Sequence, residues 1–389
     1  MPEIIDDKSE HCIPFILERL KSHKEEYGQS GEQAPPFFLG LNGVQGAGKT
    51  TLVETLHQTL SQPPHSLPTL VLSIDDLYLP HDQQEALANS HASNPLVRHR
   101  GVPSTHDVKT GVKLFHELAH RSQNVKIPSY DKSLFNGAGD RRPESAWHAV
   151  NGPDQASTEV VVFEGWCVGF RALSDEEVQR KWEAAMQEAE TGHYSGRLGK
   201  LKLEDVLFVN RKLREYNALT DKFGAFIHID AEDTRYVYDW REQQEAAMRA
   251  SKGTGMSKEQ VVEFVNGYYP CYELYTDVLR NGIFGGEKAK QLRLVVDKDR
   301  NVVQSRYIAR SKNVCPVIVK ARPNGGIRYV PVSSVRVPAI GEMGHHAIGE
   351  ESAARNDLAD MFLSSHTQLL NTAAQTSTNL FLFRIEVSR

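Results

Sequence analysis

Apolar residues fall into two alternating kinds of segment along most of the chain. Short, nearly continuous apolar runs with the length of buried strands lie at 37–41, 69–74, 159–164, 223–230 and 291–296. Longer segments with apolar residues at helical spacing lie at 13–27, 51–60, 107–121, 174–191, 203–219, 232–250 and 257–280. Strands that alternate with helices predict a doubly wound α/β fold around a parallel sheet. The run at 159–164, rich in β-branched residues, is predicted to be a central strand covered on both faces.

Two stretches lack both patterns. Residues 132–158 are polar and contain several Gly and Pro, which predicts a long loop. Residues after 302 are mostly polar with weak periodicity, although 329–337 could form an edge strand around Pro331. The predicted organisation is an N-terminal helix and linker at 1–36 and an α/β domain at 37–302. A tail at 303–389 is predicted to be disordered, poorly packed or a small appended module.

Composition narrows the class of protein. The 389 residues, 40% of them hydrophobic, suffice for one large α/β domain with insertions or for two domains. A formal charge of −5 argues against nucleic acid as the main partner, and no apolar run is long enough to predict a membrane span. Four dispersed cysteines and an acidic N-terminus without signal-peptide features favour a cytoplasmic protein, with the nucleus as a further location. The sequence gives no oligomeric state.

A phosphate-binding loop follows the first strand. Gly43-Val44-Gln45-Gly46-Ala47-Gly48-Lys49-Thr50 matches the pattern G-x-x-x-x-G-K-[ST], and Thr51 continues into the next helix. Glycines allow the backbone to curl so that its N–H groups surround a polyphosphate, and the helix N-terminus adds partial positive charge. Lys49 is predicted to reach the β- and γ-phosphates, and the Thr50 hydroxyl to bind Mg²⁺. The loop therefore predicts nucleoside triphosphate binding.

Acidic residues follow two other strands. Asp75 and Asp76 come directly after the strand at 69–74, and Glu164 ends the strand at 159–164. Because ligands bind at the carboxyl ends of parallel strands, these carboxylates should lie near the phosphates. Asp75 is predicted to accept the proton of an attacking hydroxyl and to contact Mg²⁺. Glu164 is predicted to order the same ion, at a position where Asp is more usual.

Arginines and loop residues complete the predicted site. Arg241 and Arg249 lie eight positions apart on one face of a helix, where they could close over a triphosphate as part of a lid at about 232–257. Solvent exposure is the simpler alternative for both. Loops at 98–107 and 126–142 concentrate groups that could bind a small polar acceptor. The predicted acceptor-binding residues are Asp76, Tyr78, Arg100, His106, Asp107, Tyr130, Asp131 and Arg141. Asp107 also suits a helix N-cap.

These motifs together resemble a known group of kinases. The residues that carry the resemblance are the phosphate loop, S-I-D-D-L-Y (73–78), R-G-V-P-S-T-H-D (100–107), I-P-S-Y-D-K-S (127–133), G-D-R (139–141), V-F-E-G-W-C-V-G-F (162–170) and the W-R-E-Q-Q-E-A-A-M-R helix. In these motifs the chain is similar to the D-glycerate 3-kinases of plants and their fungal ATP-dependent relatives, within the uridine kinase and phosphoribulokinase superfamily. The resemblance implies an NMP-kinase-like, three-layer P-loop fold with a central parallel sheet and a helical lid. It further implies MgATP as donor, a small hydroxylated acceptor, Asp75 as the catalytic aspartate, and Arg241 and Arg249 as lid arginines.

Three functions are compatible with this sequence. The leading one is ATP-dependent phosphorylation of a hydroxyl on a glycerate-like acceptor, which the cations of the two loops favour because glycerate carries a carboxylate. A nucleoside or vitamin kinase on the same fold is the second, and a nucleoside substrate would need an aromatic stacking pocket. The third is a nucleotide-dependent regulatory protein without a small-molecule product.

Overall fold

The computed structural model describes residues 6–29, 31, 33–192, 194–253, 255–285, 289–308, 317–321 and 327–331. The chain divides into two compact units, Met1–Arg310 and Ser311–Arg389. In the second unit the described residues form one antiparallel pair, β11 (Val317–Ala321) with β12 (Ile327–Pro331). Most of the predicted tail at 303–389 lies outside the described residues.

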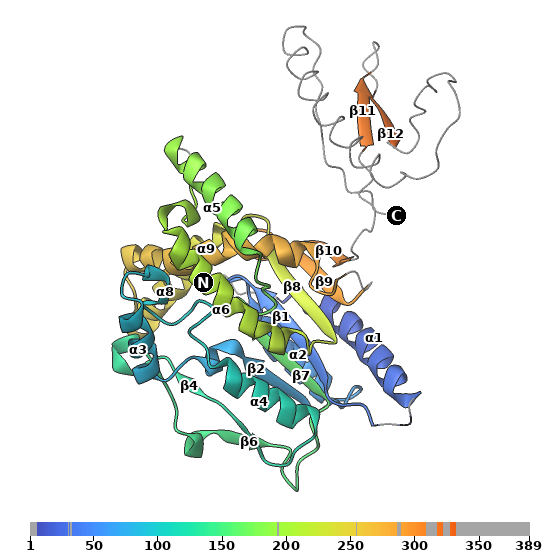
Figure 1. The fold of residues 1–389 in the computed structure, drawn as a ribbon. Helices are drawn as coiled ribbons and strands as arrows, with labels where there is room; N and C mark the ends of the chain where they lie inside the picture. The colour runs from blue at the N-terminus through green and yellow to red at the C-terminus, as the bar shows by residue number, and fades with distance from the viewer. Residues whose placement is uncertain are drawn as a thin grey trace, which may run out of the picture. The chain divides into compact units, whose positions relative to one another are not determined.

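A six-stranded sheet forms the centre of the first unit (Figure 1). Its strands are β1 (Phe37–Gly43), β2 (Thr69–Ser73), β7 (Val160–Gly165), β8 (Ala225–Ala231), β9 (Gln291–Val296) and β10 (Val302–Ile308). They stand in the order β10-β9-β8-β1-β7-β2, and all neighbours are parallel except β10 with β9. The predicted parallel sheet is confirmed, and β7 is an interior strand between β1 and β2.

The antiparallel strand β10 was not predicted. Its side chains are mostly exposed or half-buried, so it lacks the continuous apolar run of the parallel strands. It adds to the edge of β9 and carries the first compact unit past residue 302, to Arg310.

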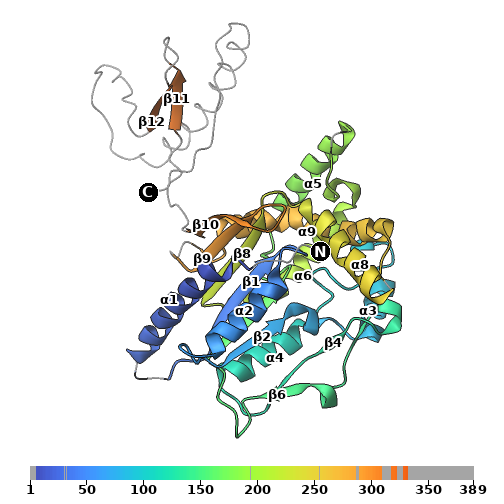
Figure 2. The ribbon, with the colours of Figure 1, turned by 180° about the vertical axis from the view of Figure 1, so that it is seen from behind.

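Helices cover both faces of the sheet, as the fold class predicts (Figures 1 and 2). The α-helices are α1 (Ser9–Gly28), α2 (Lys49–Ser61), α3 (His81–Ser90), α4 (Val108–Ala119), α5 (Asp175–Glu190), α6 (Leu203–Leu213), α7 (Asn217–Thr220), α8 (Tyr236–Lys252) and α9 (Lys258–Asn281). One face is covered by α1 and α2, where the His23 ring lies 5.3 Å from that of Phe37. The other face is covered by α4 and α9. The Phe115 ring of α4 lies 4.9 Å from that of Phe38, and the Tyr275 ring of α9 lies 5.4 Å from that of Phe170. Three layers result.

Some predicted segments are subdivided. The helix expected at 203–219 is interrupted by a short 3₁₀ turn at Arg214–Tyr216 between α6 and α7. The predicted loop at 132–158 contains β5 (Asp140–Arg141) and β6 (His148–Val150), which pair with β4 (Tyr130–Asp131) and β3 (Val125–Ile127). Further 3₁₀ turns lie at Ile74–Leu77, Pro95–Val97, Phe135–Gly137, Glu144–Ala146 and Leu198–Lys200.

The N-terminal helix belongs to the same core. Cys12, Phe15 and Ile16 of α1 are fully buried, and the Phe15 ring lies 5.7 Å from that of Tyr307 on β10. The described cysteines, Cys12, Cys167 and Cys271, are free and buried. No helix in the described part of the chain is long and apolar enough to cross a membrane.

We expect Gly169→Ala to destabilise the unit more than Gly253→Ala. Both glycines have positive φ, +81° and +68°, so alanine strains the backbone at each. At Gly169 a Cβ would also overlap the Phe226 ring, whereas at Gly253 nothing lies within 4 Å. Urea unfolding should show a loss of about 2–4 kcal/mol for the first change and about 1 kcal/mol for the second. Equal losses would contradict this account of the core.

Candidate active site

The phosphate loop joins β1 to α2 with two glycines in left-handed backbone. Gly46 has φ +83°, and Gly48, at the N-terminus of α2, has φ +92°. The Lys49 Nζ donates to Gly43 O at 2.8 Å, so its ammonium lies over the curl of the loop. Burial lowers the pKa of Lys49, and the carboxylates of Glu164 and Asp75 oppose that effect. The two acids, one on β7 and one in the turn after β2, therefore lie near enough to act on the charge of the lysine.

Side chains from distant segments hold the loop from outside. The Gln45 backbone N–H donates to the Tyr272 hydroxyl at 3.2 Å, and the Tyr268 hydroxyl donates to Gln45 Oε1 at 2.7 Å. Arg300 Nε donates to Gly46 O at 2.6 Å. None of these three supporting residues was predicted, because the tyrosines share the helical spacing of the core face of α9 and Arg300 lies in a polar turn.

Asp75 lies in the 3₁₀ turn that follows β2. The Ser73 hydroxyl accepts the Asp75 N–H at 3.3 Å, which fixes the start of this turn. Asp75 Oδ2 accepts a hydrogen bond from Lys132 Nζ at 2.6 Å. Burial alone would raise the pKa of Asp75, but the charge and hydrogen bond of Lys132, with smaller effects of His106 and Tyr78, together hold the pKa below its usual value. Asp75 is therefore an ionised carboxylate facing the phosphate loop.

The residues predicted to hold Mg²⁺ offer a suitable oxygen set. Glu164 on β7 is in register with Ser73 of β2 and Leu41 of β1, so it lies between Asp75 and the loop strand. Thr50 is exposed in the first turn of α2. In the described residues no group of three or more His, Cys, Asp or Glu is gathered for a metal. Two carboxylates and a hydroxyl suit an Mg²⁺ that takes its other ligands from phosphates and water.

His106 provides a buried hydrogen-bonding group beside Asp75. Its ring stacks on Tyr78 with centroids 4.5 Å apart, and its Nδ1 lies 2.8 Å from the Tyr216 hydroxyl. Because that hydroxyl accepts the Ser104 N–H, we assign its own proton to the bond with Nδ1. Burial lowers the pKa of His106 to about 4, so the ring is neutral and carries its proton on Nε2. Nε2 has no partner among the described residues.

Arg100 and Tyr130 form the outer wall of this region. The Arg100 guanidinium lies 5.4 Å from the centre of the Tyr130 ring and donates to Gly137 O at 2.7 Å. The Tyr130 ring meets Tyr78 edge to face with centroids 5.3 Å apart. Both tyrosine rings are therefore already packed against a neighbour.

Other predicted acceptor-binding residues are paired with the protein. Asp107 caps α4 by accepting the Thr110 N–H at 3.0 Å, and it pairs with Arg141 at 2.9 Å. Arg141 also donates to Tyr78 O at 2.8 Å, so its guanidinium ties β5 to the turn that carries Asp75. Asp131 pairs with Arg142 at 2.9 Å. Finally, Asp76 Oδ1 accepts the Tyr130 N–H at 3.1 Å. These residues brace the site.

The two arginines of the predicted lid are paired with other groups of α8 and its neighbours. Arg241 Nη2 donates to Glu245 Oε1 at 2.5 Å and lies over the Phe264 ring, 4.8 Å from its centre. Arg249 donates to Glu242 Oε1 at 2.6 Å and to the Met256 carbonyl. Trp240, next to Arg241, is the α8 residue that reaches the phosphate loop, because a Cβ at Gly46 would lie 2.5 Å from the Trp240 Cβ.

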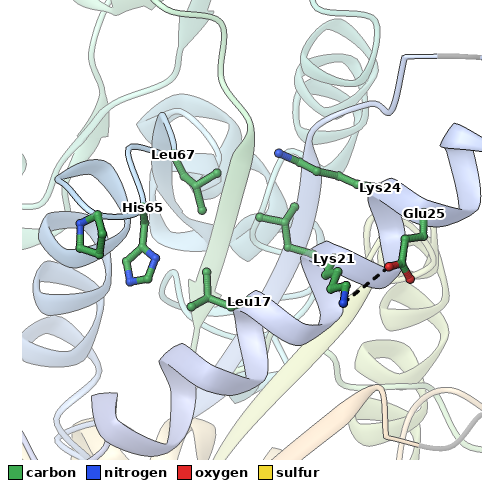
Figure 3. Close-up of a pocket in the computed structure, with 8 residues that line it drawn as sticks. Leu17, Lys21, Lys24, Glu25, His65 and Leu67 are labelled. Atoms are coloured by element: carbon green, nitrogen blue, oxygen red, sulfur yellow. Dashed lines mark ion pairs between the residues drawn. The ribbon is translucent and has the colours of Figure 1, made fainter.

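A separate pocket of about 520 Å³ lies between α1 and the turn after α2 (Figure 3). Its lining is Leu17, Leu20, Lys21, Lys24, Glu25, Pro64, His65 and Leu67. It is at the end of α2 opposite the phosphate loop, about 20 Å away along a helix of 13 residues. None of the predicted site residues lines it.

Known proteins similar to this chain include kinases. The chain is 37% identical over 289 residues to the uncharacterized kinase mug58 of Schizosaccharomyces pombe, covering 74% of this chain and 97% of that protein. It is 32% identical over 301 residues to the chloroplastic D-glycerate 3-kinase of Arabidopsis thaliana, covering 75% and 60%. The solved structure of D-glycerate 3-kinase from Cryptococcus neoformans matches with a TM-score of 0.69 and 31% identity, covering 78% and 100%. No family model matches.

We expect Arg141→Met to destabilise the protein far more than Arg142→Met. Arg141 is 11% exposed, and its loss removes the ion-pair partner of Asp107 and the side-chain donor to the Tyr78 carbonyl, whereas Arg142 is 51% exposed. Urea unfolding should show losses of about 2–4 kcal/mol for the first variant and under about 1 kcal/mol for the second. Similar stability of the two variants would show that Arg141 does not brace the site.

Proposed function

This chain belongs to the family of ATP-dependent P-loop kinases that includes D-glycerate 3-kinase, and from that premise we propose that it phosphorylates a hydroxyl of glycerate or a closely similar hydroxy acid. The observation that carries the proposal is the position of Asp75. Its ionised carboxylate faces Lys49 of the phosphate loop and is paired with Lys132 at 2.6 Å. A base, a phosphate-binding lysine and a further cation thus meet at one edge of the sheet.

The acceptor side of the site suits a small anion with hydroxyl groups. The Lys132 ammonium is 57% exposed and can turn toward a carboxylate, and Arg100 adds a second cation on the same wall. The Nε2–H of His106 offers a buried donor to an acceptor oxygen. An acid with a carboxylate and adjacent hydroxyls would satisfy all three groups.

The two alternatives are not favoured. A nucleoside would need a free aromatic face, but the Tyr78 ring is covered by His106 and the Tyr130 ring by Arg100. A regulatory protein without a product would not need the Asp75 carboxylate near Lys49, and it would not need the unpaired Nε2–H of His106. Kinase relatives across about three quarters of the chain also support an enzyme.

The residues suggest a simple division of work in phosphoryl transfer. The acceptor oxygen bonds to the γ-phosphorus while the bond from that phosphorus to the β–γ bridging oxygen breaks, and Asp75 takes the hydroxyl proton. Lys49 and the loop N–H groups offset the charge on the phosphates, and ADP leaves. Thr50, Asp75 and Glu164 would hold Mg²⁺, and the charge of that ion would offset the negative charge of the phosphates. Arg241 and Arg249 could add to this only after leaving Glu245 and Glu242.

A reducing compartment suits the buried free thiols of Cys12, Cys167 and Cys271. We therefore propose the cytoplasm as the location. Nothing in the described residues favours the nucleus over it.

Asp75→Asn should abolish phosphoryl transfer while leaving ATP binding largely intact. An amide cannot accept the hydroxyl proton, so turnover with glycerate should fall about a thousandfold or more. Turnover is measured by coupled ADP release across a panel of sugar acids, nucleosides and vitamins, and ATP affinity by calorimetry. Asp154→Asn, at an exposed position in the loop before β7 and outside the predicted site, is the control and should retain activity. Faster turnover with a nucleoside or vitamin than with any hydroxy acid would overturn the proposed acceptor.

Lys132→Met should move the acid limb of the turnover profile to higher pH. Asp75 must be ionised to act as a base, and the Lys132 ammonium holds the pKa of Asp75 below its usual value. The ammonium is the largest influence that lowers the pKa of Asp75, and burial raises that pKa. Without the ammonium the pKa of Asp75 therefore rises, and turnover is lost at a higher pH. The measurement is kcat at saturating ATP and acceptor between pH 4 and 8, about the range over which a perturbed carboxylate titrates. Arg142→Met serves as control, and an unmoved acid limb in Lys132→Met would exclude Asp75 as the titrating base.

A further inference from the structure

Arg300 connects the phosphate loop to the lid helix. Its Nε donates to Gly46 O at 2.6 Å, and its Nη2 donates to Gln243 Oε1 of α8 at 2.8 Å. The same guanidinium lies over the Trp240 ring, 5.1 Å from the ring centre. Arg300 is 7% exposed, so its charge is largely removed from water and these contacts replace part of its hydration.

The backbone of Arg300 is held in an unusual conformation. Its φ is +73°, in the left-handed region that non-glycine residues seldom adopt. In the turn between β9 and β10, the Arg300 N–H donates to Asp297 O at 3.0 Å. The Trp240 Nε1 donates to Lys298 O at 2.7 Å, which ties this turn to α8 a second time. A strained residue held by several partners is a feature of sites where position matters.

The N-terminal segment fixes Arg300 from the other side. Lys8 is 1% exposed, and its Nζ donates to Arg300 O at 2.6 Å and to Asp7 Oδ1 at 2.9 Å. Asp7 Oδ2 accepts the Val302 N–H at 2.6 Å. A buried lysine ammonium is costly unless it is paired, so this arrangement is a specific one. Residues nearly three hundred positions apart in sequence, 8 and 300, thus meet behind the loop.

We propose that Arg300 is a positioning residue for the nucleotide, and that Lys8 acts through it. A loop carbonyl that turned toward a polyphosphate would repel it, and the bond from Arg300 keeps the Gly46 carbonyl directed toward the turn between β9 and β10. The buried guanidinium also places a positive charge against the backbone that surrounds the phosphates. Lys8 holds the main chain of Arg300, so the start of the chain becomes part of the support for nucleotide binding.

The test compares Arg300→Gln, Arg300→Lys and Lys8→Met with the unsubstituted full-length protein. Lys298→Met is the matched control, because Lys298 lies in the same turn and pairs with Asp239 of the same helix but is 60% exposed. Calorimetry gives the affinity for MgADP without any acceptor, so the result does not depend on the identity of the substrate. Initial rates then give KM for ATP and KM for the acceptor separately, and urea unfolding reports stability.

Arg300→Gln should weaken MgADP binding about tenfold or more, because it removes a charged hydrogen bond to the loop. KM for ATP should rise by a similar factor, while KM for the acceptor stays unchanged. Arg300→Lys should recover part of the affinity, since an ammonium can still reach a carbonyl, and Lys8→Met should weaken binding about threefold or more. If Arg300 and Lys8 had a purely structural role, their variants would be less stable, but KM for ATP would not rise independently of KM for the acceptor.

Affinity in Arg300→Gln that matches Lys298→Met would overturn the proposal. If Arg300→Gln fails to fold, Arg300→Lys and Lys8→Met decide the question. Unchanged MgADP affinity in both of these folded variants would equally refute it, whereas a selective rise in KM for ATP in both would support it. Inactivity toward glycerate would bear on the proposed acceptor and not on this inference.

Discussion

The structure depends on one backbone constraint, which is the left-handed curl at Gly46 and Gly48. Such a curl suits glycine, and at Gly46 a side chain would also collide with Trp240. A loop of this shape exposes main-chain groups that the loop itself cannot fully pair, so its neighbours must do so. Tyr272 accepts the Gln45 N–H and Arg300 donates to the Gly46 carbonyl. The curl that suits phosphate binding thus requires support from α9 and from the turn between β9 and β10.

The residues at the sheet edge divide into those that can meet reactants and those that brace them. Lys49, Asp75 and Lys132 are charged, and the buried Nε2 of His106 has no hydrogen-bond partner among the described residues. Arg141 and Asp107 satisfy each other and the turn that carries Asp75. This division explains why so many charged loop residues surround a small site. An exposed charge pair alone would contribute little, but a pair that fixes the backbone of the turn bearing Asp75 controls where that carboxylate lies.

The sequence predicted what is encoded locally. The loop at Gly43–Gly48 lies in one contiguous segment, and Asp75 and Glu164 follow from the rule that ligands bind at the carboxyl ends of parallel strands. It could not predict Lys8, Arg300 or Tyr272, because their contacts join residues that are far apart in the chain. β10 was missed for a related reason, since an antiparallel edge strand with exposed side chains has no apolar run. For predicted acceptor residues such as Arg141, residue type alone could not show that their hydrogen bonds are already made with the protein.

The lid arginines differ in how easily they can exchange their partners for a triphosphate. Arg241 pairs with Glu245, whose side chain is 3% exposed. Among the described residues, departure of the arginine would leave this buried carboxylate with only the Met256 N–H, 2.9 Å away, as a partner. Arg249 pairs with Glu242, whose side chain is 25% exposed and thus less buried than that of Glu245. Losing one member of a buried ion pair costs several kcal/mol, roughly 3–5, whereas a partly exposed pair costs much less to separate. Movement of Arg249 toward bound phosphates is therefore energetically easier than movement of Arg241, which also lies over Phe264. The N-terminal half of α8 is held in place, because Trp240 packs against Gly46 of the phosphate loop and Gln243 accepts a hydrogen bond from Arg300. A shift of the helix is therefore easier at its C-terminal end, which carries Arg249.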